Sequence, residues 1–427
     1  MPFQYITYSR QAIKEPVIPL QVGRYRLDYL AFSRPENAHK PPLLVVGGAF
    51  QTFNSYKYCV ERIYDDFPVV LIDLPSLGNN EQIAPDMGME ELADMLYQMV
   101  QMMDYRQVHL MGLSLGSAVA AAFAYKYPQV TGKLITAGVV VSPRKSWRML
   151  IDESVRVLDE GRMDPFSQAV VLYLINYQRL KETGMNPTAR KLFYRQMKRL
   201  NDNERERYKI NGRRLSTTPG LLGFPDCETL VTTGEFDSFT LPWENAAFAK
   251  GCPNGHFVLI ENADHLPQLE QREVSLELFS SFLNGKPLSQ VKGIRLLNKS
   301  DIDKMERRRD VRRLMVNPAA RLVTEQGSPD PLDLPATVVD INYYGCLLEI
   351  KDAGFSMEVH HRDCEIRLQL PGITLGVLIF ERASAHRYRC LFKHGSVVQS
   401  EAFVEQLKNP SFFLLPNEGC SRLAISG

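Results

Sequence analysis

The sequence has few of the features that mark membrane, secreted or metal-binding proteins. It contains no apolar run of roughly 18 residues, so no transmembrane helix is expected. The N-terminus, MPFQYITYSRQAIKEP, lacks a basic start followed by an apolar stretch, so no secretory signal is predicted. The seven cysteines form no CxxC pair, which argues against a zinc site or a disulfide framework. These absences predict a cytoplasmic protein with reduced thiols and no bound metal.

An excess of charge of one sign is lacking as well. Lys and Arg number 50 against 49 Asp and Glu, a formal net charge of +1, which argues against a general nucleic-acid binder. The 427 residues exceed one typical domain, and the 44% hydrophobic content is ordinary for a globular chain. We therefore expect more than one domain and no nucleic-acid partner.

Short apolar segments alternate with helical patterns over residues 1–285, which predicts an α/β domain. The near-continuous Val, Ile and Leu content of these segments is typical of parallel strands covered by helices on both faces. Strands are predicted at residues 43–46, 69–72, 108–111, 134–141, 230–233 and 257–260. Helices are predicted at residues 89–103, 117–126 and 270–283.

Residues 143–225 interrupt this alternation with a helical, aromatic and basic block, which we interpret as a lid over an active site. Residues 143–214 contain 17 Lys and Arg against 9 Asp and Glu. Such a lid could hold an acyl chain and dock an anionic acyl carrier, either coenzyme A or acyl carrier protein. The alternative is a solvated basic surface with no role in recognition.

The chain changes character after residue 285. Residues 286–303 are predicted to be a linker, and residues 304–427 a small all-β domain. Its predicted elements are strands at residues 336–341, 345–350, 364–370, 373–380 and 388–392, and a final helix at residues 400–407.

The strongest catalytic motif is GLSLG at residues 112–116. It lies between a predicted strand and a predicted helix, which is the context of a nucleophile elbow with Ser114 as the nucleophile. The flanking glycines would let neighbouring backbone approach the strained serine. The following helix N-terminus would favour negative charge at the site.

An acid and a histidine follow Ser114 in the order that a serine triad on this type of fold requires. Asp237 follows the strand at residues 230–233, and His265 follows the strand at residues 257–260. His265 would be the general base for Ser114, and Asp237 would orient and stabilise its imidazolium. Glu235, Asp264 and Asp226 are alternative acids, and His256 is an alternative base.

The loop Gly47-Gly48-Ala49-Phe50 follows the first core strand and is the expected position of an oxyanion hole. We predict the backbone N–H groups of Ala49 and Leu115 as its donors. The alternative is a glycine pair that serves only a turn.

Five segments together resemble the landmarks of the α/β-hydrolase superfamily: LLVVGGAF, VVLIDLPSLG, HLMGLSLGSAVA, VTTGEFDSF and ENADHLPQLE. The resemblance spans roughly residues 40–285. GGAFQTFNSY, DLPSLG and GEFDSFT are most similar to the enzymes that make the hydroxyalkanoyloxyalkanoate precursor of rhamnolipids, which implies an acyltransferase-like member. Gly47 departs from the superfamily's common His-Gly motif, but an oxyanion hole made of backbone groups does not need that histidine.

RRRDVRR at residues 307–313 and DINYYG at residues 340–345 lie at the start of the all-β domain. An arginine run alone usually marks a solvated patch. Together, however, the two segments resemble the signature of PilZ domains, over about residues 304–405, which implies binding of cyclic di-GMP. Asn342 departs from the serine that the family commonly has.

The PilZ resemblance assigns roles to individual residues. Arg308 and Arg312 would clamp the phosphates and stack on the guanines, which lysine cannot do. Asp340 would accept a hydrogen bond from a guanine edge, Asn342 would bond nearby, and Gly345 would let the ligand approach. The helpers of the arginine pair would be Arg307, Arg309 and Arg313.

We therefore predict a serine hydrolase or acyltransferase that acts on an acyl ester or thioester, needs no catalytic cofactor and is regulated by cyclic di-GMP. The rival hypothesis is a non-catalytic cyclic di-GMP receptor that uses the hydrolase fold as a scaffold for protein interactions. A haloperoxidase or a lyase on the same fold is a weaker third hypothesis.

Overall fold

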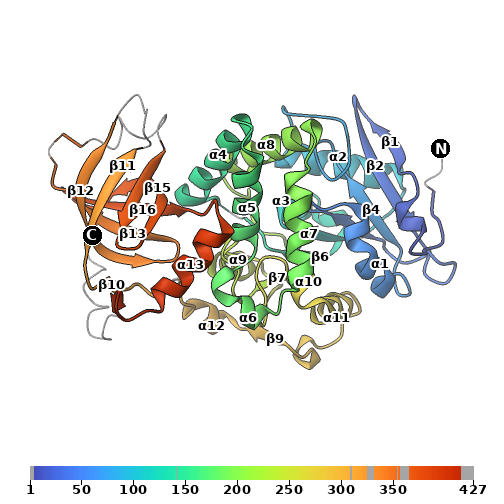
Figure 1. Ribbon diagram of the computed structural model, residues 1–427. Coiled ribbons are helices and arrows are strands. Elements are labelled where there is room, and N and C mark those ends of the chain that lie inside the picture. The colour runs from blue at the N-terminus through green and yellow to red at the C-terminus, as the bar shows by residue number, and fades with distance from the viewer. Residues whose placement is uncertain are drawn as a thin grey trace. The chain divides into compact units, whose positions relative to one another are not determined.

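The computed structural model describes residues 4–140, 142–307, 310–324, 331–352, 354–355 and 365–414. The chain divides into two compact units (Figure 1). The sheet unit comprises Met1–Pro143, Leu174–Lys191 and Arg199–Arg307. The barrel unit comprises Arg144–Tyr173, Leu192–Lys198 and Arg308–Gly427.

The sheet unit is built on a nine-stranded sheet in the order β1-β2-β4-β3-β5-β6-β7-β8-β9. Neighbouring strands from β4 to β8 are parallel, whereas β1, β2 and β9 extend the two edges with antiparallel pairs. The strands are β1 Ile18–Val22, β2 Tyr25–Phe32, β3 Leu43–Val46, β4 Val69–Asp73, β5 Val108–Leu113, β6 Thr131–Ala137, β7 Glu228–Gly234, β8 Gly255–Ile260 and β9 Ile294–Leu297.

Helices cover both faces of this sheet because successive strand residues point to opposite sides. On one face Leu44 and Leu110 pack against α2 (Met89–Met102) and α3 (Leu115–Lys126). On the other face Leu43 and Met111 pack against α1 (Lys57–Ile63) and α11 (Arg272–Leu283). Helix α9 (Pro242–Gly251) covers β7 and β8. The predicted fold class is confirmed for this part of the chain.

Helix α8 (Asp202–Thr217), from the predicted lid, is anchored to the loop that follows β4. The buried guanidinium of Arg207 donates to the Asn80 carbonyl, and the buried amide of Asn211 donates to the Ser76 carbonyl. The other short elements of the sheet unit are η1 Ala12–Lys14, η2 Phe53–Tyr56, η3 Pro128–Val130, η4 Tyr177–Arg179, α6 Leu180–Thr183, α10 Pro267–Glu270, η5 Leu288–Gln290 and α12 Lys299–Asp303.

The segment 286–303, predicted to be a linker, differs from that expectation. Its strand β9 pairs with β8 and completes the edge of the sheet. The helix α12 follows directly, with Asn298 as its N-cap. The short segment Ile294–Leu297 therefore forms a strand because the open edge of β8 supplies its hydrogen-bond partners.

The barrel unit contains a closed six-stranded antiparallel barrel, which confirms the predicted small all-β domain and adds a strand, β11, to the five that the sequence predicts. Its strands, in barrel order, are β11 Ala319–Thr324, β12 Asp333–Asn342, β13 Gly345–Glu349, β16 Arg387–Lys393, β15 Ile373–Arg382 and β14 Ile366–Leu370. A two-stranded ladder of β10 (Leu314–Met315) and β17 (Phe413–Leu414) lies outside the barrel. Helix α13 (Val397–Leu407) inserts the fully buried Phe403 into the core of the barrel.

Part of the predicted lid packs on this barrel. The helices concerned are α4 (Lys145–Asp159), α5 (Met163–Leu174) and the C-terminal half of α7 (Pro187–Lys198). Lys393 of β16 forms a largely buried 3.0 Å ion pair with Glu153 of α4. The Tyr173 hydroxyl donates to the Phe392 carbonyl at 3.1 Å. The lid sequence is thus shared between the two units.

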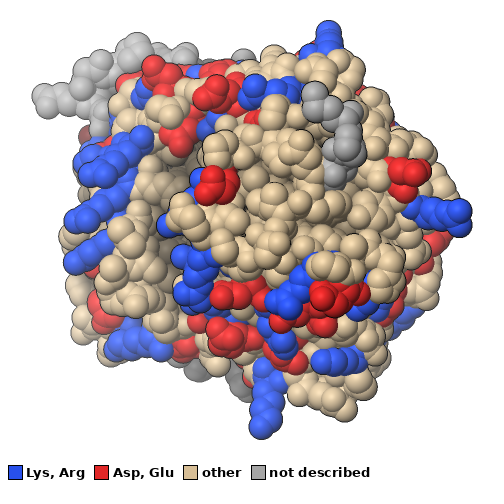
Figure 2. Space-filling view, turned by 90° about the vertical axis from the view of Figure 1, so that its right-hand side faces the viewer, with Lys and Arg blue, Asp and Glu red and all other residues tan. Residues whose placement is uncertain are grey.

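The face shown in Figure 2 carries Lys and Arg interspersed with Asp and Glu around a broad area of uncharged residues. Within the described ranges, no helix combines the length and apolar character needed to cross a membrane.

Candidate active site

Ser114 occupies a sharp turn between β5 and α3, with a left-handed φ of 49° and ψ of −117°. This conformation is strained for a residue with a side chain, and it must be supported by the packing around it. A Cβ on Gly116 would lie 2.1 Å from the Val46 carbonyl oxygen, and one on Gly112 would lie 2.5 Å from the Gly116 carbonyl oxygen. Both glycines are therefore required by the close approach of backbone around the serine.

The predicted nucleophile, base and acid form one hydrogen-bonded chain. Ser114 Oγ lies 3.1 Å from His265 Nε2, and His265 Nδ1 lies 3.0 Å from Asp237 Oδ2. The side chains of His265 and Asp237 are almost completely buried. The topology of the sheet brings the three residues together. Ser114, Asp237 and His265 follow the carboxyl ends of β5, β7 and β8, and these parallel strands end at the same edge of the sheet.

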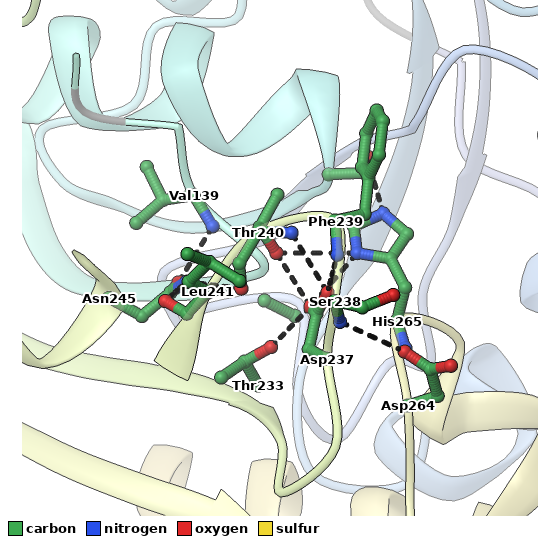
Figure 3. A network of polar contacts seen from close by, with 12 residues as sticks. Val139, Thr233, Asp237, Ser238, Phe239, Thr240, Leu241, Asn245, Asp264 and His265 are labelled. Carbon is green, nitrogen blue, oxygen red and sulfur yellow. Dashed lines mark hydrogen bonds and ion pairs between the residues drawn. The ribbon is translucent and has the colours of Figure 1, made fainter. Parts of the chain in front are cut away.

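Asp237 is surrounded by hydrogen-bond donors (Figure 3). The hydroxyls of Thr233 and Thr240 each donate to Oδ2 at 2.6 Å. The N–H groups of Phe239 and Thr240 donate to Oδ1 at 2.9 and 2.8 Å. Burial opposes ionisation of Asp237, but His265 and the two hydroxyls outweigh it and lower the pKa of the carboxyl. Asp237 is therefore an anion that can stabilise a charged His265.

The alternative residues lie elsewhere or make other contacts. Glu235 pairs with Arg295 and accepts the N–H of Asn262. Asp226 and His256 are exposed. Asp264 is fully buried beside the site, where it bonds backbone N–H groups.

The loop predicted to form the oxyanion hole lies next to Ser114. The Gly48 N–H donates to the Gln51 side-chain oxygen at 2.7 Å, and the same oxygen accepts the Tyr56 hydroxyl at 3.0 Å. In the part of the chain that the structure describes, the N–H groups of Ala49 and Leu115 have no protein acceptor.

Sequence reasoning missed several residues that support this site. Thr233 and Thr240 hold Asp237, Gln51 holds the glycine loop, and Glu270 accepts the Asp264 N–H at 2.5 Å. No motif identifies these residues, because their roles depend on loop geometry. Among the described residues, no group of three or more His, Cys, Asp or Glu side chains is placed to hold a metal ion.

In the barrel, Arg312 forms an ion pair with Asp340 of β12. The Asn342 side chain accepts the N–H groups of Tyr344 and Gly345, each at 3.0 Å, and so closes the turn between β12 and β13. A Cβ on Gly345 would lie 2.1 Å from the Cys390 carbonyl oxygen, so the adjacent strand β16 already requires glycine there.

The arginine run is only partly described. Arg308 and Arg309 lie outside the described residues. The Arg307 guanidinium lies 5.5 Å from the centre of the Trp243 ring, a cation–π distance. Arg313 forms a 3.2 Å ion pair with Asp310, and its backbone bonds that of Ile341. Of the predicted ligand-binding residues, the structure pairs Arg312 with Asp340 and bonds Asn342 to Gly345 within one turn.

Comparison with known proteins gives a family match for the first part of the chain. The sequence model of the alpha/beta hydrolase fold family matches residues 41–271. A poly(3-hydroxyalkanoate) depolymerase of Ectopseudomonas oleovorans is 31% identical over 116 residues, which is 26% of this chain and 41% of that protein. A 2-hydroxy-6-oxononadienedioate/2-hydroxy-6-oxononatrienedioate hydrolase of Pseudomonas putida is 24% identical over 222 residues, 51% of this chain and 77% of that protein.

Solved structures share the fold of the same part. MGS-M2, an alpha/beta hydrolase enzyme from a deep-sea metagenome library of the Medee basin, is similar with a TM-score of 0.57 and 17% identity. The similarity covers 63% of this chain and 97% of MGS-M2. A thermophilic esterase from Thermogutta terrifontis has a TM-score of 0.53 and 24% identity, with 64% of this chain and 99% of the esterase covered.

Proposed function

Because the chain belongs to the alpha/beta hydrolase fold family, we propose that it is a serine-dependent hydrolase or acyltransferase acting on acyl esters or thioesters. One observation carries this proposal: the hydrogen-bonded chain Ser114–His265–Asp237. It has the connectivity that turns a serine hydroxyl into a nucleophile.

We propose one step for each group of the site. Ser114 Oγ attacks the acyl carbon while His265 Nε2 accepts the hydroxyl proton, and Asp237 stabilises the resulting imidazolium. The N–H groups of Ala49 and Leu115 bind the oxyanion, and each such donor contributes roughly 3 kcal/mol to the transition state. His265 then gives its proton to the departing alcohol or thiol. Water or a hydroxyl acceptor, deprotonated by His265, releases the acyl group from Ser114.

Esters of 3-hydroxy acids are the substrate class that we propose. The similarity to a protein named poly(3-hydroxyalkanoate) depolymerase supports this class. The resemblance of GGAFQTFNSY and GEFDSFT to enzymes that build hydroxyalkanoyloxyalkanoates points to the same chemistry. These two enzyme types imply opposite outcomes, hydrolysis and acyl transfer, which the acceptor in the second step would decide.

A thioester of coenzyme A or of acyl carrier protein is the proposed donor if the enzyme transfers acyl groups. The excess of basic residues in the predicted lid supports an anionic carrier. Two of these basic residues serve the fold: Arg207 and Arg214 are buried and donate hydrogen bonds to backbone carbonyls. The carrier would therefore contact the exposed basic residues that remain.

Labelling with a fluorophosphonate probe tests the catalytic proposal. The wild-type protein should be labelled and should release p-nitrophenol from acyl esters, and Ser114→Ala should do neither. Ser216→Ala, which changes a serine of α8, is the control and should be labelled like the wild type. Persistent labelling of Ser114→Ala would exclude Ser114 as the nucleophile. A wild-type protein inert in both assays would favour the non-catalytic scaffold.

Binding of cyclic di-GMP by the barrel is the second part of the proposal. The resemblance of RRRDVRR and DINYYG to the PilZ signature supports it. The Arg312 side chain is 47% exposed although it is paired with Asp340, so a phosphate could take over the guanidinium.

The packing of α4 and α5 on the barrel suggests how binding would influence the lid. Glu153, Tyr173 and Gln168 contact β16 or the start of α13. A ligand that binds two arrangements of these contacts with different affinity would shift the population of the lid. The change in turnover that the ligand can cause is limited by the difference between its affinities for the two arrangements.

Calorimetric titration with cyclic di-GMP, paired with turnover measurements, tests this regulation. Tyr173→Phe removes the hydroxyl bonded to Phe392 and should leave ligand binding intact while reducing the response of turnover. Tyr125→Phe, an exposed tyrosine of α3, is the control. No binding would exclude the receptor role, and binding without any change in turnover would exclude the regulatory role.

A further inference from the structure

Two further acids, the buried Asp264 and the half-buried Glu270, lie beside the loop that carries His265. Asp264 is 0% exposed, and Asp237 is 2% exposed. Glu270 of α10 contacts the Asp264 backbone, since its Oε2 accepts the Asp264 N–H at 2.5 Å. The mechanism above uses Asp237 and gives no role to Asp264 or Glu270.

Asp264 connects the two loops that carry the acid and the base (Figure 3). Its Oδ1 accepts the N–H of His265 at 2.7 Å and the N–H of Ser238 at 3.3 Å. Ser238 directly follows Asp237, so one oxygen atom sets the spacing between the acid loop and the base loop. A carboxyl in this position controls the geometry of the Asp237–His265 hydrogen bond without touching substrate.

The second carboxyl oxygen of Asp264 and that of Glu270 indicate whether these two groups are ionised. Asp264 Oδ2 and Glu270 Oε1 are buried, and within the described residues neither has a hydrogen-bond partner. If either carboxyl group ionised, its unpaired oxygen would carry negative charge in a buried place without a donor, so the surroundings favour the protonated form. Burial, together with the charges of Asp237 and Glu270, raises the pKa of Asp264 well above its usual range. Burial raises the pKa of Glu270 to about 8.

The other groups close to Asp264 and Glu270 supply little positive charge that could stabilise their ionised forms. The titratable neighbours of Asp264 are Asp237 and Glu270, both acids. Glu270 faces Asp237 and the hydroxyl of Thr183. His265 forms its ion pair with Asp237. An ionised Asp264 would place a second anion next to Asp237 and compete with it for the positive charge on His265.

We propose that Asp264 and Glu270 are positioning residues that keep their protons during turnover, and that ionisation of this pair at alkaline pH lowers the rate. The neutral Asp264 holds the His265 loop against the Asp237 loop. Loss of its proton changes the charge beside Asp237 and loosens the alignment of His265 with Ser114. This inference rests on the serine mechanism proposed above and adds the residues that set its alkaline limit.

Three substitutions separate positioning from charge. Asp264→Asn keeps an acceptor for the two N–H groups but cannot ionise, so it should stay active and lose the alkaline fall in kcat/KM. Glu270→Gln removes the negative neighbour that helps to raise the pKa of Asp264, so it should move the alkaline fall to lower pH. Asp264→Ala removes the acceptor and should lower kcat roughly 100-fold with little change in KM, since small misplacements of catalytic groups cost that much.

Glu273→Gln, an exposed acid of α11, is the matched control and should leave the pH profile unchanged. Unchanged kcat in Asp264→Ala, or an unchanged alkaline limb in both Asp264→Asn and Glu270→Gln, would overturn the inference. If Asp264→Ala does not fold, the pH profiles of the other two variants decide. Fluorophosphonate labelling of Ser114 in every variant distinguishes failure of this inference from failure of the serine mechanism.

Discussion

His265 Nδ1 lies 3.0 Å from Asp237 Oδ2, in a pocket where both side chains are buried. The bond fixes which nitrogen of the imidazole carries the proton, so that Nε2 faces Ser114 as an acceptor. Two threonine hydroxyls and two backbone N–H groups hold the carboxylate in place. The orientation of the base therefore depends on one acid that is itself fully hydrogen-bonded.

Asp237→Asn should lower kcat by about four orders of magnitude, because an amide would stabilise the wrong tautomer of His265. The side chain keeps its size, so the loop should keep its conformation. Turnover of a p-nitrophenyl ester measures the loss. Asp226→Asn, which changes an exposed alternative acid, is the control, and an equal loss there would contradict the assignment.

Gly116→Ala should destabilise the fold by about 1–3 kcal/mol, because the added methyl meets the backbone of β3. Gly395→Ala is a matched control in the barrel unit, where the nearest atom to the added methyl would be Pro165 Cβ at 4.0 Å. Urea unfolding of both variants measures the difference. Equal free energies of unfolding for the two variants would show that the turn at Ser114 can accept a methyl group at position 116.

Arg214→Met should destabilise the protein by about 3 kcal/mol, since the buried guanidinium is bonded to the carbonyls of Met87 and Ala84 and to Asn211. Arg214 is 6% exposed, and this burial lowers its pKa to about 10. The adjacent Arg213 is exposed, so Arg213→Met should change stability by no more than about 0.5 kcal/mol. Thermal unfolding of the two variants side by side checks this contrast.

Glu270 should make the protein less stable as the pH rises. Its pKa is about 8 in the folded chain against an ordinary 4.5, so the folded state holds the extra proton between these values. The free energy of unfolding should therefore fall between pH 4.5 and 8, by up to about 1.4 kcal/mol per pH unit. Glu270→Gln should flatten this dependence in urea unfolding curves. A slope identical to that of the wild type would contradict the prediction.

Arg312→Ala should abolish or strongly weaken binding of cyclic di-GMP if the barrel is the receptor. Arg321→Ala is a close control, because Arg321 also forms an exposed ion pair with an aspartate of the barrel, Asp333. Calorimetric titration should show a loss for the first variant only. Equal weakening in both would indicate a general effect of positive charge on the barrel.

The sequence predicted the core of the sheet unit well, because buried parallel strands form unbroken apolar runs such as Leu43–Val46. It missed the hairpin of β1 and β2, whose residues mix apolar and polar types at the edge of the sheet. It also treated the short strand β9 as a linker, because its pairing with β8 depends on a partner distant in sequence.

Ser114, Asp237 and His265 could be identified because each follows a strand in a motif with a fixed order. The residues that support them have no such signature. Thr240 and Asp264 act through loop conformation, and Asp264 was considered only as an alternative acid. The glycine at position 345 was assigned to ligand approach, whereas the neighbouring strand β16 already requires it.

Helices α4 and α5 have a practical consequence for dissecting this protein. A hydrolase fragment cut at residue 303 would keep both helices but lose Phe392, Lys393 and Val397, to which Tyr173, Glu153 and Gln168 are bonded. Low activity of such a fragment would then reflect a damaged lid and would not show that the enzyme needs an activator. A fair comparison of the two halves requires point substitutions in the intact chain.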